Sequence, residues 1–336
     1  MLTREDCEKR EYQILSPLAT HAAETRGRLE DETKCDYRTE FQRDRDRIIH
    51  SKSFRRLMHK TQVFLSPEAD HYRTRLTHTI EVSQVARTIA RMLQYNEDLT
   101  EAIALGHDLG HTPFGHNGEN VLNRIHPSGF QHNVQSLRTV DILETTSKRQ
   151  GLNLTAEVRD GILNHRGENK PFTLEGQIVR ISDRIAYINH DIDDAIRSNV
   201  LKESDLPKQD LEVLGFTHSD RINNLIVDVC RNSEGKNEIS LSKDFGDALL
   251  DLREFMFKNV YLSDKVIFEA NLNMVETVIT SLYDYYLNNP EDLPPLYKTV
   301  AEKDGIREAV KDNVAGMTDR YAMKLYSDLF VPTTWK

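Results

Sequence analysis

Residues 178–196 read IVRISDRIAYINHDIDDAI, and this stretch indicates the fold class more clearly than any other part of the chain. Its six isoleucines, at positions 178, 181, 185, 188, 192 and 196, recur every three or four residues, which places them on one face of an α-helix. The opposite, polar face carries Asp183, Tyr187, His190 and Asp194, with Asp191 at its margin. Two interpretations fit this polar face: it simply meets water, or it is turned to a functional site.

Helical periodicity continues on both sides of this stretch. Upstream, apolar spacing and stop residues predict helices over 40–58, from just before His78 to 93, over 99–109, 117–125 and 134–143, and from an N-cap at Thr155 to 165–167. Downstream, three helices are expected around 222–229, 245–256 and 266–282, and a last one is capped by Thr318. The exceptions are a loop over 63–73, a linker over 290–295 and a short strand at 238–241. We therefore expect an all-α fold.

The 336 residues are enough for one large domain or two modest ones. Residues 1–36 have no sustained apolar period, so we expect a polar, loosely held N-terminal arm. Residues 37–200 hold the informative motifs and are expected to form the catalytic core. Residues 201–336 are expected to form a helical C-terminal region packed on that core.

Composition narrows the class of protein. Charged residues make up 29% of the chain and the net charge is −10, which disfavours generic binding to nucleic acid or acidic membranes. No apolar run is long enough to span a bilayer, and the first residues, MLTREDCEKREYQIL, lack a signal-peptide core. Three scattered cysteines suggest neither a disulfide framework nor a thiolate zinc site. We expect a cytoplasmic protein that does not engage membranes.

Charge is uneven along the chain, with a basic segment between Arg38 and Lys60. This segment fits a small polyanion such as a nucleotide, or a contact between subunits. A solvated helix face with internal ion pairs is an equally good interpretation. The basic residues are Arg38, Arg43, Arg45, Arg47, Lys52, Arg55, Arg56 and Lys60.

Residues 106–119, GHDLGHTPFGHNGE, combine three histidines, two carboxylates, four glycines and a proline. His107 and Asp108 are neighbours, so both can reach one metal ion only at a helix end and with ligands from other segments. His78, at the start of one predicted helix, and Asp183, on the polar face of another, are candidates. A single histidine is more often a hydrogen-bonded structural residue than a ligand. Together, two imidazoles and two carboxylates suit Mn²⁺, Fe²⁺, Mg²⁺ or Zn²⁺.

The order His78, His107-Asp108, Asp183 resembles the H…HD…D pattern of HD-domain phosphohydrolases. More closely, the chain is similar to deoxynucleoside triphosphate triphosphohydrolases of the dGTPase type. The resemblance spans residues 41–194, and downstream the chain matches only in being helical. It rests on FQRDRDRIIHSKSFRRLMHKTQVF (41–64), RLTHTIEVSQVAR (75–87), GHDLGHTPFGHNGE (106–119) and RISDRIAYINHDIDD (180–194).

The resemblance implies an HD-domain helical core and a role for each matching residue. It places the metal on His78, His107, Asp108 and Asp183. It makes His116 and Glu119 the catalytic pair, with His111 and His132 as further active-site histidines. It assigns the sugar to Gln62, Tyr187 and Asp191 and the phosphates to Arg75 and Arg184.

By this resemblance the chain hydrolyses dGTP, and other dNTPs as a further option, to deoxynucleoside and tripolyphosphate. The metal is then Mn²⁺, Mg²⁺ or Fe²⁺, with Zn²⁺ or Ni²⁺ as occupants in crystals. A homo-oligomer is expected; a dNTP as allosteric effector and single-stranded nucleic acid as a partner are left open. One alternative is an HD-type 5′-nucleotidase acting on nucleoside monophosphates. The other is an HD protein that senses nucleotides or binds single strands without turnover.

Overall fold

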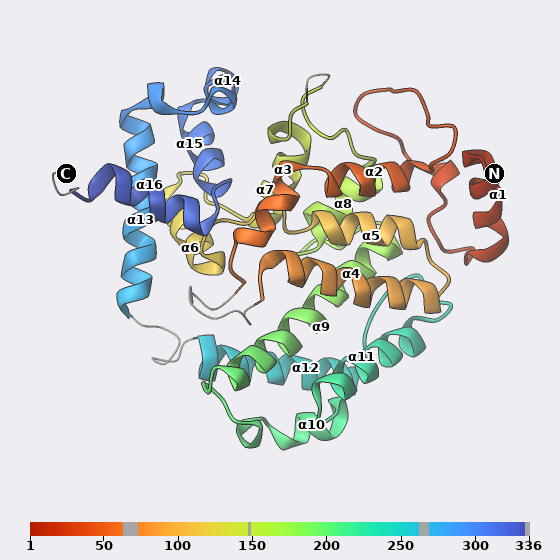
Figure 1. The fold of residues 1–336 in the computed structure, drawn as a ribbon. Helices are drawn as coiled ribbons and strands as arrows, with labels where there is room; N and C mark the ends of the chain where they lie inside the picture. The colour runs from red at the N-terminus through yellow and green to blue at the C-terminus, as the bar shows by residue number, and fades with distance from the viewer. Residues whose placement is uncertain (63–72, 147–148, 262–268, 333–336) are drawn as a thin grey trace. The chain divides into compact units, whose positions relative to one another are not determined.

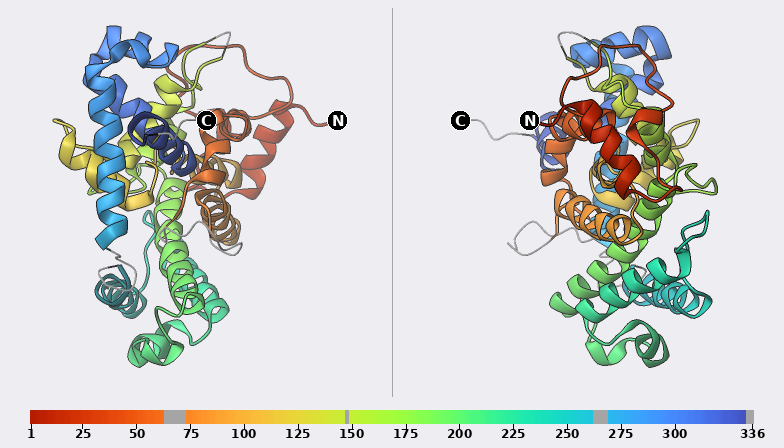
Figure 2. Two further views of the ribbon diagram at one scale, coloured as in Figure 1. Left: turned by 60° about the vertical axis from the view of Figure 1, so that its left-hand side comes forward. Right: turned by 90° about the vertical axis from the view of Figure 1, so that its right-hand side faces the viewer.

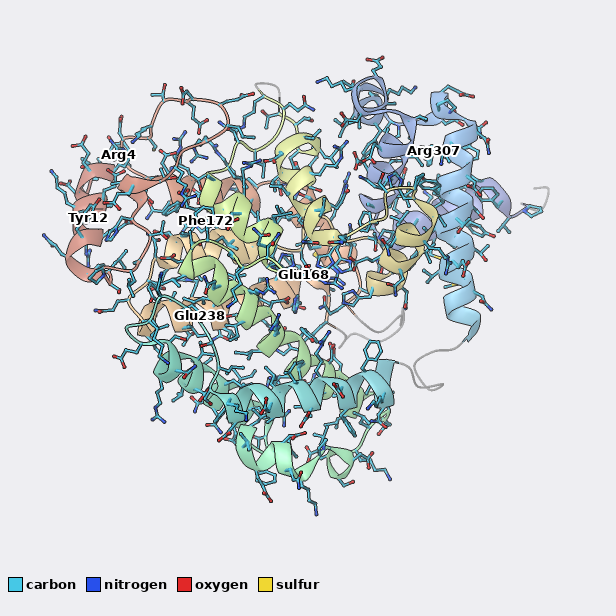
Figure 3. The ribbon with its side chains drawn as sticks, turned by 180° about the vertical axis from the view of Figure 1, so that it is seen from behind. Arg4, Tyr12, Glu168, Phe172, Glu238 and Arg307 are labelled. Atoms are coloured by element: carbon cyan, nitrogen blue, oxygen red, sulfur yellow. The ribbon has the colours of Figure 1, made fainter. Side chains whose placement is uncertain are left out.

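In the computed structural model, residues 1–62, 73–146, 149–261 and 269–332 are described. Within them the chain forms sixteen α-helices and no strand, which confirms the all-α prediction (Figure 1). The predicted strand at 238–241 is wrong: Gln177 and Ser233 side chains accept the backbone N–H groups of Ile239 (3.1 Å) and Ser240 (3.0 Å). Those amides are therefore satisfied without a neighbouring strand. Glu238, in this irregular segment, is labelled in Figure 3.

The helices are, in chain order, α1 (Arg4–Ile14), α2 (Glu40–Ile49), α3 (Lys52–Arg56), α4 (Arg75–Met92), α5 (Glu97–Gly106), α6 (Gly115–Ile125), α7 (His132–Arg138), α8 (Ala156–Asn164), α9 (Leu174–Arg197), α10 (Lys208–Leu214), α11 (His218–Ser233), α12 (Lys243–Met256), α13 (Glu269–Asn288), α14 (Pro295–Asp304), α15 (Ile306–Ala315) and α16 (Asp319–Phe330).

The chain forms two compact units, each built from separate stretches of sequence. Unit 1 comprises Met1–His50, Thr77–His107 and Leu152–Ile267. Unit 2 comprises Ser51–Leu76, Asp108–Gly151 and Phe268–Lys336. The sequence-based limits at 36 and 200 remain a prediction, and the units follow a different division.

In unit 1, helix α5 packs against α2, α8 and α9, and α9 also packs against α11 and α12 (Figures 1 and 2). Asn96 caps α5 by accepting the N–H of Leu99 (3.1 Å), and Thr173 caps α9 by accepting the N–H of Gly176 (3.1 Å). The isoleucine stripe of α9 faces this core, with Ile178, Ile185 and Ile192 fully buried.

The polar face of α9 does not simply meet water. His190, Asp191 and Asp194 on this face are buried, and Tyr187 is half-buried. Burying polar groups is costly unless they have partners, so this face has a purpose beyond solvation.

Residues 1–36 are part of unit 1, and polar contacts anchor them to its other segments rather than leaving them loosely held. Glu175 accepts the N–H and hydroxyl of Thr20 (2.9 and 2.8 Å), and Glu157 accepts the N–H of Arg26 (2.7 Å). The side chain of Arg28, only 5% exposed, pairs with Glu40 and Asp44. On α1, Arg4 and Tyr12 are labelled in Figure 3. The prediction rested on the low apolar content of this stretch, which does not reveal hydrogen bonds and ion pairs to distant carboxylates.

In unit 2, helix α13 packs against α6, α15 and α16 around an apolar cluster (Figures 1 and 2). Phe114, Leu122, Ile279 and Val310 belong to this cluster. Thr318 caps α16 by accepting the N–H of Tyr321 (3.3 Å), which confirms the predicted cap.

Two local predictions need correction. The helix expected over 40–58 is interrupted, because the hydroxyl of Ser51 accepts the N–H of Phe54 (3.1 Å) and starts a new helix, α3. Thr155 is at the N-cap of α8, but its side chain makes no capping hydrogen bond. The predicted loop at 63–73, except Arg73, and the predicted helical positions 266 and 267 lie outside the described residues.

Candidate active site

Unit 1 brings three of the predicted metal ligands together. Nε2 of His78, on α4, lies 3.2 Å from Oδ1 of Asp183 on α9. Nε2 of His107, at the C-terminal end of α5, lies 3.8 Å from the same oxygen. The two imidazole centroids are 5.7 Å apart. Three helices distant in sequence therefore point two ring nitrogens at one carboxylate.

The donor set suits a divalent metal ion. Two ligand atoms about 2.1 Å from one ion are roughly 3.0 Å apart at a right angle and 3.4 Å apart at the tetrahedral angle. The His78–Asp183 separation falls in that range, and the His107–Asp183 separation exceeds it by a few tenths of an ångström. Nδ1 of His107 lies 2.7 Å from the carbonyl of Ala104, which leaves the lone pair on Nε2.

Electrostatics keep Asp183 ionised. Burial by itself would raise its pKa, but the hydrogen bond from His78 and the nearby His107 outweigh it and hold the pKa below the ordinary value. An ionised carboxylate beside imidazole nitrogens is the charge state that a metal ion requires. Asp108 follows His107 directly in the chain and belongs to unit 2.

Two histidines outside the predicted set join the unit 1 cluster. His165 ends α8 as His107 ends α5, with Nδ1 2.7 Å from the carbonyl of Ile162, and its ring centroid is 5.0 Å from that of His107. His190 places Nδ1 3.0 Å from Glu81 and stacks on His218 at 5.6 Å. The sequence could have marked His165 as a site residue, because it lies just before a helix-ending glycine, as His107 does. No such pattern surrounds Glu81 or His218.

The other predicted residues of α9 differ in exposure. Asp191 is buried, whereas Arg184 is exposed. Burial, together with the negative charges of Asp183 and Asp191, raises the pKa of Tyr187 to about 12, so its phenol stays neutral. Asp183, Tyr187 and Asp191 therefore share one face of α9, and the positive charge of Arg184 acts on the pKa of Tyr187 in the opposite direction.

In unit 2, Asp108 pairs with Arg75, the first residue of α4. Nη1 of Arg75 lies 2.7 Å from Oδ2 of Asp108, and both side chains are buried. Nη2 of Arg75 donates to the carbonyl of Gln62 (3.3 Å). The predicted phosphate-binding arginine thus holds a predicted metal ligand and the backbone of a predicted sugar-binding residue.

Glu119, on α6, is the centre of the second cluster. Its Oε2 lies 3.2 Å from Nδ1 of His116. Its Oε1 accepts the backbone N–H of His132 (3.0 Å) and lies 2.9 Å from Nδ1 of the same residue. Burial would raise the pKa of Glu119, but hydrogen bonds from His116 and His132 outweigh it and keep the pKa far below the ordinary value. Glu119 is therefore an acceptor that orients both rings through Nδ1.

The three histidines differ in environment. Reduced hydration of its ring lowers the pKa of His116, although the Glu119 hydrogen bond opposes the shift, and 57% of the side chain remains exposed. Burial lowers the pKa of His111 well below the ordinary value, and the charge of Arg75 acts in the same direction. His111 stacks on His132 at 4.6 Å, and neither of its ring nitrogens has a hydrogen-bond partner among the described residues.

Two groups in unit 2 also have the spacing of metal ligands: Asp108, His111 and His132, and His111, His116 and Glu119. Glu119 is engaged by two histidines, and Asp108 uses Oδ2 for Arg75, which leaves only Oδ1 for an ion. The charge of Arg75 also disfavours a second cation there. We therefore interpret this cluster as a proton-handling and anion-binding group.

Glycines shape the segment that carries this cluster. A Cβ on Gly110 would come 2.1 Å from the backbone nitrogen of Ser136, so only glycine allows this approach. Gly115 has a left-handed backbone (φ +57°), and a Cβ there would come 2.6 Å from the carbonyl oxygen of Gln62. The segment from Gly110 to Gly115, where the sequence predicted a helix end, is thus a tight turn that lies against the backbone of Ser136 and Gln62.

The basic segment is largely occupied by ion pairs within the chain. Arg43 pairs with Glu40 and Glu32, and Arg45 pairs with Asp98 and Glu101. Arg38 pairs with Asp46, and Lys60 is buried. These contacts favour the internal ion-pair interpretation for Arg38, Arg43 and Arg45.

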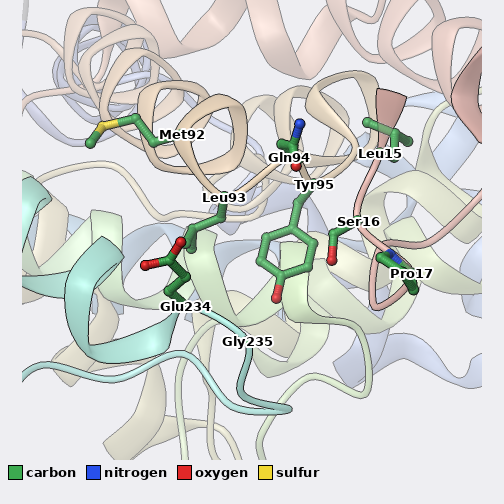
Figure 4. A pocket seen from close by; sticks show the side chains of 9 residues that line it. All are labelled: Leu15, Ser16, Pro17, Met92, Leu93, Gln94, Tyr95, Glu234 and Gly235. Carbon is green, nitrogen blue, oxygen red and sulfur yellow. The ribbon is translucent and has the colours of Figure 1, made fainter. Parts of the chain in front are cut away.

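A surface cavity of about 190 Å³ lies elsewhere in unit 1 (Figure 4). None of the predicted site residues lines it. Its walls are Leu15, Ser16, Pro17, Met92, Leu93, Gln94, Tyr95, Glu234 and Gly235. In the described part of the chain, no helix is long and apolar enough to cross a membrane.

Two known protein families match parts of the chain. Residues 75–188 match the HD domain, and residues 239–328 match the phosphohydrolase-associated domain. A hypothetical protein from Aquifex aeolicus of known crystal structure is 22% identical, with a TM-score of 0.47 over 86% of this chain and 68% of that chain.

Close relatives extend along the whole chain. A deoxyguanosinetriphosphate triphosphohydrolase-like protein of Caldanaerobacter subterraneus subsp. tengcongensis is 57% identical, covering 100% of this chain and 98% of that protein. Proteins of the same description from Clostridium perfringens (strain 13) and Clostridium tetani are 50% and 47% identical over 99% of this chain, and over 98% and 97% of their own lengths. The chain therefore carries a hydrolase domain of the HD type and belongs to the family of deoxyguanosinetriphosphate triphosphohydrolase-like proteins.

Proposed function

We propose that the protein hydrolyses deoxynucleoside triphosphates, dGTP among them, to the deoxynucleoside and tripolyphosphate in a metal-dependent reaction. The observation that carries this proposal is the pairing of His116 with Glu119, because a monophosphate hydrolase of the HD type needs the metal ligands but not this pair. The names of the relatives, at 47–57% identity, support the same substrate class.

In this proposal His78, His107, Asp108 and Asp183 hold a divalent ion, with Mn²⁺, Mg²⁺ and Fe²⁺ as the candidates. Such an ion polarises the α-phosphate and lowers the pKa of a bound water. Asp183 supplies an ionised carboxylate, and His107 supplies an Nε2 lone pair fixed by the Ala104 carbonyl. The four side chains provide two nitrogen and two oxygen donors, which suits a borderline or hard ion.

In this proposal His116 accepts the proton of the attacking water and donates a proton to the leaving oxygen. With Nδ1 held by Glu119 and more than half of the side chain exposed, Nε2 is the nitrogen that can meet the substrate. A water oxygen bonds to the α-phosphorus, the bond from that phosphorus to O5′ breaks, and O5′ takes up a proton. A histidine of lowered pKa can accept the water proton near neutral pH and pass one to O5′.

Charge and shape select the substrate. The exposed Arg184 would neutralise the triphosphate, since guanidinium groups bind phosphate oxygens in pairs. Arg75 would join it only by exchanging part of its buried contact with Asp108 for phosphate oxygens. Tyr187, neutral and half-buried, would pack against the sugar, with Asp191 and Gln62 as hydrogen-bonding groups. A deoxyribonucleotide, which lacks the 2′-hydroxyl, would fit this packed face better than a ribonucleotide.

The test uses purified protein reconstituted with Mn²⁺, Mg²⁺ or Fe²⁺ and supplied with each dNTP singly and as a mixture, with products separated. Deoxynucleoside and tripolyphosphate in equal amounts support the proposal. Orthophosphate released from deoxynucleoside monophosphates supports a 5′-nucleotidase instead. Tight dNTP binding without any product supports a sensing protein. Activity that appears only with the mixture would add a second nucleotide as an activator.

A further inference from the structure

Asp319, the first residue of α16, joins two segments that are far away in the sequence. Its Oδ2 accepts hydrogen bonds from the backbone N–H (2.9 Å) and the hydroxyl (2.7 Å) of Thr61. Its Oδ1 accepts the backbone N–H of Phe114 (3.0 Å). All three residues belong to unit 2. We call this set of contacts the Asp319 bridge.

The two bridged segments carry residues assigned to the reaction. Thr61 directly precedes Gln62, and Phe114 lies between His111 and His116. Phe114 has a left-handed backbone (φ 62°) and occupies the N-cap of α6 without a side-chain capping bond. A non-glycine residue is strained in this conformation, so the surrounding contacts must hold it.

Two groups of contacts hold Phe114 in place. Its side chain is 4% exposed and packs in the apolar cluster of unit 2. Its N–H, which no side chain of α6 accepts, is satisfied by Asp319. Asp319 thus provides from α16 the acceptor that a capping box would provide from within α6.

Lys60 makes a second connection between the same parts of unit 2. Its ammonium group, on a residue only 3% exposed, donates to the carbonyl of His111 and to the carbonyl of Ala315 (2.9 Å). Ala315 ends α15, four residues before Asp319. Residues 60–61 and 111–114 are therefore both tied to residues 315–319.

The charge of Asp319 suits its position. It is the first residue of α16 and accepts an N–H at the start of α6, so two helix N-termini favour its carboxylate. An asparagine has one acceptor oxygen, so it would keep the contact with either Phe114 or the Thr61 backbone but not both.

We propose that Asp319 is a positioning residue: by holding Thr61 and Phe114 it fixes the segments that carry Gln62, His111 and His116. The C-terminal helices thereby set the geometry of the reaction, which gives a role to the region that matches the phosphohydrolase-associated domain. The inference rests on the proposed function for the roles of those three residues.

The test compares full-length, metal-loaded Asp319→Ala and Asp319→Asn with the matched control Thr318→Ala. The control removes the hydroxyl that caps the same helix but contacts neither Thr61 nor Phe114, and should lower the stability of the protein through the loss of that cap. Asp319→Ala should speed amide hydrogen exchange at residues 61–62 and 111–116 and lower kcat by about 10–100-fold, the scale expected for a small misplacement of reacting groups. Metal content should not change, and Asp319→Asn should fall between wild type and Asp319→Ala.

In the control, exchange at those segments should stay at the wild-type rate, and kcat should change less than twofold. If Asp319→Ala and Thr318→Ala gave the same exchange and the same kcat, Asp319 would act only through helix stability and the proposal would be overturned. Loss of the metal from Asp319→Ala would overturn it as well. Wild-type protein that releases no deoxynucleoside from any dNTP would refute the proposed function, while the exchange measurement would still decide on the bridge.

Discussion

Each unit gathers histidines around one carboxylate, but the two clusters use opposite nitrogens of the ring. In unit 1, His78 and His107 turn Nε2 toward Asp183, at 3.2 and 3.8 Å. In unit 2, His116 and His132 turn Nδ1 toward Glu119, at 3.2 and 2.9 Å. Nitrogens that converge on an ionised carboxylate suit a shared cation, whereas nitrogens anchored through Nδ1 leave Nε2 to exchange protons with a ligand. We therefore propose that the choice of ring nitrogen separates a metal-binding cluster from a proton-transfer cluster.

The largest effect is expected from Asp183→Ala, which removes the carboxylate that both unit 1 histidines face. Metal content should fall to near zero and dNTP hydrolysis below detection, because two imidazoles and the single carboxylate of Asp108 hold a hard ion weakly. Elemental analysis after gel filtration, together with the product assay, measures both.

The matched control is Asp193→Asn on the same helix, where the carboxylate pairs with Arg197 at 3.2 Å. It should retain metal and activity. An Asp183→Ala protein that kept a full complement of metal would show that the unit 1 cluster is not the metal site.

His116→Ala tests the other half of the comparison. The metal should stay bound, since Asp183 and its partners are untouched, while kcat should fall by roughly 10²–10⁴, the usual contribution of a general acid or base. Steady-state kinetics on protein of verified metal content makes the measurement. Metal loss in this variant would contradict the division of roles between the clusters.

Lys60 gives a pH-dependent stability effect within unit 2. Burial lowers its pKa to about 7, against an ordinary value near 10.5 in the unfolded chain. Between these values the unfolded state binds more protons than the folded state, so stability should rise with pH, by at most about 1.4 kcal/mol per pH unit.

Urea unfolding at intervals from pH 7 to 10 measures this slope, and Lys60→Met should remove it. An equal slope in wild type and Lys60→Met would show that other groups cause it.

The smallest effect is expected from Arg45→Ala, in the basic segment. Arg45 is 27% exposed and pairs with Asp98 and Glu101, so stability should change by no more than about 1 kcal/mol. The KM for dNTP should stay within twofold, because the guanidinium is engaged inside unit 1. A KM increase of tenfold or more would restore the polyanion interpretation of this segment.

Local patterns in the sequence were enough to predict most of the helices, although not α1, α10, α14 and α15, and for physical reasons. The isoleucine spacing of α9 reports directly on which face is buried, and Ile178, Ile185 and Ile192 are indeed fully buried. Capping is also local, as the prediction at Thr318 illustrates. The break at Ser51 was missed because apolar residues continue through it while a single hydroxyl restarts the helix.

Long-range polar contacts could not be predicted in the same way. Asp319 and Thr61 are 258 residues apart, and nothing in either neighbourhood marks them as partners. The N-terminal stretch was expected to be loose because its anchors are buried carboxylates such as Glu157 and Glu175 rather than apolar side chains. Site residues were proposed from their motifs, whereas the choice between Nδ1 and Nε2 depends on backbone geometry that sequence spacing does not contain.

The most direct test of the account is hydrolysis of dGTP by metal-loaded protein in ¹⁸O-labelled water, with both products analysed by mass spectrometry. Attack on the α-phosphorus with loss of O5′ predicts one labelled oxygen in tripolyphosphate and none in deoxyguanosine. Label in deoxyguanosine, or release of orthophosphate or pyrophosphate in place of tripolyphosphate, would contradict it.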